Sequence, residues 1–129
     1  MPADIFALYK GRIAGRVLDT NGKPVRNIAI TLVSADAKPE HILPEANGKG
    51  TGTTMFSNRD GSYGFAQLTP GRYLLVLNRK DFQDSKTELS RMLPTVLYPG
   101  VHDISAATVI IVTGDKKPEA YDFVLPIQQ

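Results

Sequence analysis

The residue that most invites a catalytic interpretation is Ser62, in the segment NRDGSYGF that begins at residue 58. A nucleophilic serine on a strand-to-helix elbow follows the pattern Gly-x-Ser-x-Gly. Here Asp60 occupies the position of the first glycine, and no helix is expected after the serine. Asp-Gly is instead typical of a tight turn between strands. We therefore predict that Ser62 is an exposed strand residue that follows a turn, and no catalytic residue is assigned.

The chain has two histidines, His41 and His102, and no cysteine. A catalytic zinc site normally takes three protein ligands. Glu40, Glu45 or Asp103 could complete such a set, but no ligand spacing recurs. The turns DTNG and NRDG both lack the first ligand of a calcium loop. The sequence therefore predicts no metal, no cofactor and no enzyme activity.

Composition excludes two further classes of partner. The net charge is +2, and no run of Lys and Arg exceeds two residues, so nucleic-acid binding through a basic surface is not expected. No apolar stretch approaches the roughly 18 residues that span a bilayer, so no membrane insertion is expected. The N-terminus lacks the features of a signal peptide. Residues 1–10 are interpreted as a tail or linker, and residues 11–129 as a single domain.

Short β-rich segments separated by Gly, Pro, Asn and Asp dominate the chain. Such spacing predicts an all-β protein with about seven strands, a β-sandwich or barrel. The expected strands lie in residues 12–19, 27–34, 51–58, 62–68, 72–78, 107–114 and 120–127. Residues 35–50 and 80–97 are long loops, and Ser85 to Glu88 could cap a helical turn.

Period-two alternation assigns one face of each strand to the core. The residues expected to point inward are Ile13, Val17, Ile30, Leu32, Tyr63, Phe65, Tyr73, Leu75, Val109, Ile111, Phe123 and Leu125. Gly61 and Gly71 follow Asp60 and Pro70 in turns, and both are expected to have positive φ.

Three groups of motifs occur in a characteristic order. They are GRIAGRVLDTNGKPVRNIAITL, then SNRDGSYGFAQLTPGRYLLVL, then LYPGV and AYDFVLP. Together they resemble the carboxypeptidase regulatory-like domains, which are Greek-key sandwiches of the transthyretin (prealbumin) type. The resemblance implies a non-catalytic accessory module that acts as a docking or spacer domain in a larger bacterial protein. It also implies a location outside the cytoplasm, in the periplasm, on the surface or secreted.

Three strands are apolar on both faces. A strand with one face in solvent should instead alternate apolar and polar residues. The side chains expected to point away from the core are Leu74, Val76, Ile110 and Val112. Residues 80–97 could cover them, using Phe82, Leu89, Met92 and Leu93. Alternatively, they form a docking surface for a second copy or a neighbouring domain, because exposed apolar patches mark interaction sites.

Carbohydrate binding is the alternative function. Sugar-binding sandwiches present flat aromatic faces, yet the chain has no Trp. The residues left as ligand candidates in loops are His41, Phe82, Tyr98 and His102. The sequence does not identify the ligand, the partner, the host protein or the oligomeric state.

Overall fold

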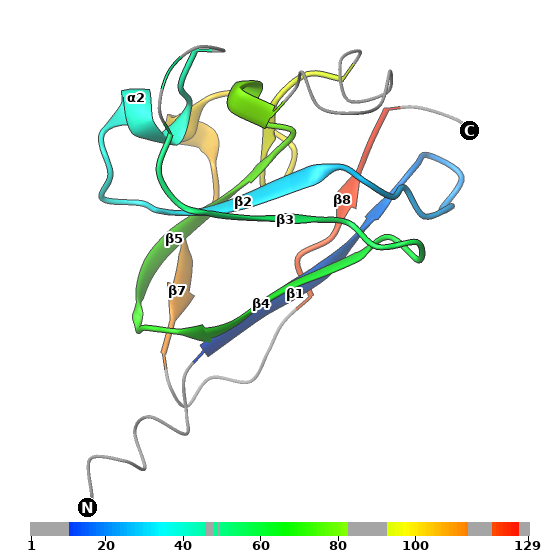
Figure 1. Cartoon of the computed structure of the whole chain (residues 1–129), viewed down its shortest axis with the longest axis horizontal. Coiled ribbons are helices and arrows are strands. Elements are labelled where there is room, and N and C mark those ends of the chain that lie inside the picture. Colours follow the sequence, from blue (N-terminus) through cyan, green and yellow to red (C-terminus); the bar gives the residue numbers. More distant parts are fainter. Residues whose placement is uncertain (1–10, 46–47, 49, 83–92, 114–119, 127–129) are drawn as a thin grey trace, which may run out of the picture.

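The computed structural model describes residues 11–45, 48, 50–82, 93–113 and 120–126, in which two β-sheets enclose a common core (Figure 1). The smaller sheet has the strand order β4-β1-β8. Its strands are β1 (Gly11–Leu18), β4 (Ser62–Leu68) and β8 (Phe123–Val124). Strand β4 runs antiparallel to β1, whereas β8 runs parallel to it.

The larger sheet has the order β3-β2-β5-β6, and β7 also pairs with β5. Its strands are β2 (Ala29–Ser34), β3 (Thr53–Phe56), β5 (Gly71–Leu77), β6 (Val96–Leu97) and β7 (Ile110–Val112). All its pairings are antiparallel. The described part of the chain is therefore the expected β-sandwich, with eight strands instead of about seven.

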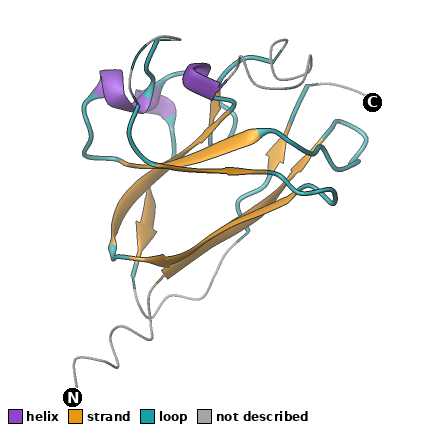
Figure 2. Cartoon of the chain, in the orientation of Figure 1, coloured by secondary structure: helices purple, strands orange, loops and turns teal. Residues whose placement is uncertain are grey.

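The helical elements lie on the outer side of the larger sheet, away from β1 and β4 (Figure 2). They are α2 (Pro39–Ile42) and two 3-10 turns, η1 (Lys80–Phe82) and η2 (Ile104–Ala106). Pro39 begins α2, where its missing N–H is not needed. No helix in the described ranges is long and apolar enough to cross a membrane.

The core between the sheets contains most of the side chains that alternation assigns to it. Those found buried are Ile13, Val17, Ile30, Leu32, Tyr63, Phe65, Leu75, Phe123 and Leu125. Tyr73 is only partly buried and packs against this core. Strand β1 shows why the prediction works, because every second residue from Gly11 to Val17 is buried.

The orientation expected for β7 is wrong by one residue. Ile110 and Val112 point into the core, whereas Ile111 is 47% exposed and Val109 is half-buried on the other side of the sheet. The segment VIIV is apolar at every position, so alternation cannot decide which pair faces inward. Pairing with β5 decides it, because Ile110 lies opposite Tyr73.

The expected docking surface is also wrong, because all four of its residues are buried within the chain. Ile110 and Val112 belong to the core, and Leu74 and Val76 belong to a second apolar cluster on the outer face of the larger sheet. This outer cluster is completed by Val33, Ile42 and Leu97, and by partly buried residues of segments 35–43 and 101–109.

Of the apolar residues proposed for the cover, the two that the structure describes do not belong to the outer cluster. Leu93 is buried in the core between the sheets, and Phe82 is only half-buried. Leu89 and Met92 lie outside the described residues, as do the Ser85–Glu88 segment and residues 1–10. The shielding segments instead contribute alanine, valine, leucine and isoleucine side chains without a strand or helix period that would mark them as a cover.

One of the two expected glycine conformations is confirmed. Gly61 has φ +81°, and a Cβ there would lie 2.6 Å from the carbonyl oxygen of Val17. Gly71 does not have positive φ and begins β5, so that expectation is wrong. The left-handed residue that precedes this turn is Gln67, with φ 57°.

Candidate functional site

Ser62 is part of a hydrogen-bonded turn. Its hydroxyl donates to Oδ1 of Asp60 at 2.6 Å and accepts from Nδ2 of Asn58 at 3.2 Å. The same Asp60 oxygen accepts the backbone N–H of Ser62 at 3.1 Å. The hydroxyl proton is thus directed at a carboxylate, and neither histidine is among its hydrogen-bond partners. The arrangement braces the β3–β4 connection.

The hydrogen bonds from Ser62 hold the pKa of the Asp60 carboxyl below its ordinary value of 3.8, and the nearby guanidinium of Arg16 contributes in the same direction. Asp60 is therefore ionised at neutral pH. An ionised carboxylate at a turn can accept these bonds but cannot act as a general acid.

Tyr63 is a second residue whose hydroxyl is committed to structure. It donates a hydrogen bond to the carbonyl oxygen of Tyr121. Burial raises the pKa of Tyr63 far above its ordinary value, and the charge of Asp122 adds to the shift. The phenol therefore stays protonated at neutral pH and ties β4 to the segment that leads into β8.

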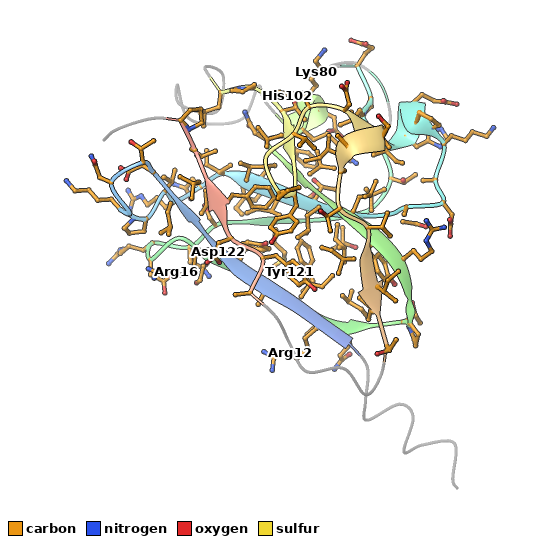
Figure 3. All side chains as sticks on the ribbon, turned by 180° about the vertical axis from the view of Figure 1, so that it is seen from behind. Arg12, Arg16, Lys80, His102, Tyr121 and Asp122 are labelled. Carbon is orange, nitrogen blue, oxygen red and sulfur yellow. The ribbon has the colours of Figure 1, made fainter. Side chains whose placement is uncertain are left out.

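A cavity of about 480 Å³ opens at the end of the sandwich where β5 finishes. Its apolar walls are Leu43, Pro44, Leu93 and Pro94. Its polar lining is Glu45, Arg79, Lys80, Thr95 and His102. Figure 3 shows Lys80 and His102 at this end, away from Arg12 and Arg16.

Arg79 forms a rigid wall of the cavity. Its side chain is 3% exposed, and its Nε and Nη2 donate to the two carboxylate oxygens of Asp81 at 2.8 and 2.9 Å. Nη1 donates to the carbonyl oxygen of Thr51 at 2.7 Å. The Phe82 ring lies 5.9 Å from the guanidinium carbon. A buried arginine is tolerated when its charge is paired and its donors are satisfied, as they are here.

Gly50 allows this placement of the guanidinium. A Cβ at this position would lie 2.3 Å from Nη2 of Arg79, inside van der Waals contact. A side chain at residue 50 would therefore displace the arginine from its partners. The close approach of backbone and guanidinium explains the glycine.

The segment before β6 is attached to the end of β5 by side-chain bonds. Nδ2 of Asn78 donates to the carbonyl oxygen of Leu93 at 2.9 Å, and Oγ1 of Thr95 donates to the carbonyl oxygen of Asn78 at 2.9 Å. Asn78 is buried and has φ 55°, a conformation that asparagine tolerates better than most residues. These bonds fix one side of the cavity.

Three polar side chains at the mouth are exposed. Nζ of Lys80 lies 3.6 Å from Oε2 of Glu45, and both side chains are mostly in solvent. Nδ1 of His102 lies 3.1 Å from the carbonyl oxygen of Thr95. Because a carbonyl can only accept, this contact places a proton on Nδ1 and leaves Nε2 for another partner.

The structure separates the four ligand candidates expected from the sequence. His102 lines the cavity, whereas His41 contributes its carbonyl oxygen, which accepts the Thr51 N–H at 3.0 Å. Phe82 packs edge-on against Phe56, with ring centroids 6.3 Å apart. Tyr98 packs edge-on against two aromatic rings, Tyr121 and Phe123.

Sequence reasoning did not single out Arg79 and Lys80 as lining residues. The signal is the tripeptide Arg-Lys-Asp at residues 79–81, which begins two residues after the apolar strand β5 ends at Leu77. Charged side chains at the end of a buried strand must either reach solvent or form ion pairs. Within the described ranges, no group of three or more His, Cys, Asp or Glu side chains is placed to hold a metal ion.

The two sheets packed around a common core define a β-sandwich domain. A model of the carboxypeptidase regulatory-like domain matches residues 12–125, and the chain belongs to that family. The family resemblance based on the sequence motifs is thereby confirmed. The comparison with curated proteins gave no significant match.

Solved structures with a similar fold share little sequence with the chain. A streptococcal ancillary pilin matches with TM-score 0.54 and 14% identity, over 90% of this chain and 32% of the pilin. The dioxygenase domain of a dioxygenase–carbohydrate-binding protein fusion from Streptomyces sp. SirexAA-E matches with TM-score 0.52 and 15% identity, over 91% of this chain and 79% of that domain.

The major pilin subunit of Bacillus cereus, in its D312A form, matches with TM-score 0.49 and 14% identity, over 91% of this chain and 29% of the pilin. The chain thus spans about a third of the pilins it resembles. At this level of identity the likeness concerns the fold alone.

Proposed function

We propose that this chain is a non-catalytic interaction module within a longer bacterial polypeptide that acts outside the cytoplasm. The observation that carries the proposal is that its potentially reactive side chains are engaged in structural hydrogen bonds and ion pairs. Ser62 and Asp60 brace a turn, Tyr63 bonds a carbonyl, and Arg79 is paired with Asp81 and bonded to the Thr51 carbonyl. Membership of the regulatory-like domain family supports the same function.

The longer polypeptide is supported by the coverage of the pilins, whereas the dioxygenase domain is matched over 79% of its length. The chain matches 32% of the streptococcal ancillary pilin, which is the share expected of one domain among several. Pilins are surface proteins of bacteria, so the proposed location is the periplasm, the cell surface or the medium.

The contact surface we assign to a neighbouring domain is the outer face of the smaller sheet. The central strands β2 and β5 of the larger sheet are covered on both faces by the chain itself, whereas Met55, Phe56 and Ile111 on its edge strands β3 and β7 are exposed. On the smaller sheet Val124 is 65% exposed, and Arg16 and Arg12 of β1 are also exposed, with Arg16 the nearer to Val124 in the register. Figure 3 shows both arginines and Asp122 on this side. Mixed charge around an apolar residue is typical of contacts between domains of one chain.

Fractionation of the source cells tests the longer polypeptide. An antibody against the folded domain should detect a protein clearly larger than 129 residues in the periplasmic, surface or secreted fraction. A band of the size of this chain, found in the cytosol alone, would refute the proposal.

A stability measurement on that larger protein tests the contact surface. A domain that docks on a neighbour melts at a higher temperature in the parent protein than in isolation. The substitution Val124→Asp should remove this difference, while the isolated domain keeps its own melting temperature because residue 124 is exposed. Ile111→Asp, at an exposed position of the larger sheet, is the matched control.

The carbohydrate alternative gains no support from the loop aromatics. Tyr98 and Phe82 both pack against other aromatic side chains of the protein, and no aromatic residue lines the described part of the cavity. Flat stacking on a sugar ring needs a free aromatic face, which these contacts reduce.

A further inference from the structure

The cavity at the end of β5 has a composition that suits a small ligand. Its volume of about 480 Å³ falls within the range of roughly 300–1,000 Å³ that small-molecule sites occupy. Two leucines and two prolines make apolar walls, and a few polar groups lie between them. Neither the turn at Ser62 nor the outer face of the smaller sheet uses this cavity.

The described walls are held in place without a ligand. Arg79 is fixed by Asp81 and by the Thr51 carbonyl. Asn78 and Thr95 connect the end of β5 to the segment that carries Leu93. Walls that are already held in place need little rearrangement when a ligand binds, which lowers the entropy cost of binding.

Among the described lining residues, Lys80 and His102 are exposed and can still bond a ligand. Arg79 has its charge neutralised by Asp81, so it does not attract an anion. The contact of Lys80 with Glu45 is 3.6 Å long and exposed, and such pairs are weak and exchange readily. His102 uses Nδ1 on the Thr95 carbonyl and retains Nε2. A ligand oxygen could therefore accept from Lys80.

Charge and shape limit the ligand class. Lys80 supplies one ammonium group to the ligand, and the neighbouring carboxylate of Glu45 repels a dianion more strongly than a monoanion. A ligand with a single negative charge is therefore favoured. A sugar ring would find no aromatic partner among the described lining residues. The leucine and proline walls suit a branched aliphatic group.

We propose that this cavity binds a monocarboxylate joined to a short aliphatic group. Lys80 holds the carboxylate in place of Glu45, His102 borders it, and Leu43 and Leu93 contact the aliphatic part. The C-terminus of a peptide and a free small acid share this chemistry. The inference does not depend on the proposed docking function.

Nuclear magnetic resonance titration of the 129-residue chain with N-acetyl-leucine tests the proposal. The expected result is saturable shifts of the backbone amides of Leu43, Leu93, Thr95 and His102. N-acetyl-leucinamide, which lacks the charge, should cause much weaker shifts. No saturation, equal binding of the amide, or equal competition by inorganic phosphate would overturn the proposal.

Two variants locate the binding. Lys80→Met should weaken binding by about tenfold or more, as expected for loss of a charged hydrogen bond. Lys23→Met, at an exposed position between β1 and β2, is the matched control and should bind as the native chain does. His102→Gln provides a second test at the other side of the mouth. Unchanged affinity in both Lys80→Met and His102→Gln would overturn the assignment.

The source of the carboxylate is distinguished by two further probes. A tripeptide that ends in leucine with a free carboxylate represents a peptide terminus, and 4-methylpentanoate represents a free acid. Stronger binding of the tripeptide supports a peptide ligand, and equal binding supports a small acid. If neither probe binds saturably, the proposal fails even where the domain proves to be part of a larger surface protein.

Discussion

Asp60 is an exposed carboxylate that the fold stabilises in its charged form. Its pKa is depressed, so its contribution to stability is present above the ordinary value of 3.8 and is lost as the pH falls through the lower value of the folded protein. We expect Asp60→Asn to lower the urea midpoint at neutral pH. The difference in urea midpoint between Asp60→Asn and the native chain should disappear in strong acid, where Asp60 is protonated.

The control for this measurement is Asp103→Asn, because the Asp103 side chain makes no capping hydrogen bond at η2. Its urea midpoint at neutral pH should match that of the native chain. A midpoint for Asp60→Asn equal to that of the control would show that the Ser62 hydrogen bonds add no stability.

At the scale of the element, the two turn glycines are expected to behave differently. Gly61→Ala places a side chain at φ +81° and 2.6 Å from a carbonyl oxygen, so it should destabilise the protein by about 1–3 kcal/mol. Gly71→Ala meets its nearest atom at 3.7 Å, in ordinary contact. It should be neutral or stabilise by up to about 1 kcal/mol. Denaturant melts of both variants measure these free energies, and equal losses would contradict the turn assignment.

Strand β7 offers a second comparison between neighbours. Ile110→Ala removes a core side chain that is 3% exposed and should cost about 2–5 kcal/mol. Ile111→Ala removes a side chain that is 47% exposed and should cost less than about 1 kcal/mol. The reverse order in denaturant melts would mean that β7 pairs with β5 one residue out of the register described.

At the scale of the whole molecule, the outer apolar cluster makes the segments 35–43 and 101–109 part of the fold. Val76→Asp would place an unpaired charge where the side chain is fully buried, and a loss of about 4 kcal/mol or more is expected. Circular dichroism during thermal unfolding measures the loss. Val124→Asp, on the exposed face, should have the same melting temperature as the native chain. If Val76→Asp retains native stability, the cover seen over this face is not formed.

The sequence by itself determined the features that depend on residues close to one another along the chain. Alternation placed Ile13, Val17, Tyr63 and Phe65 in the core because the other face of β1 and β4 carries polar or small residues. Asp60-Gly61 marked a turn with positive φ, because few residues other than glycine adopt that conformation. The ordered motifs also identified the family.

Only the tertiary structure decided which face of β7 is buried, what covers the larger sheet, and where the cavity lies. VIIV is apolar throughout, so the local pattern carries no information on its orientation. The cover comes from apolar side chains in segments far from β5 in sequence. Arg79 is buried because Gly50, Thr51 and Asp81 meet it in space. Each of these outcomes depends on contacts between distant segments, which a local pattern does not encode.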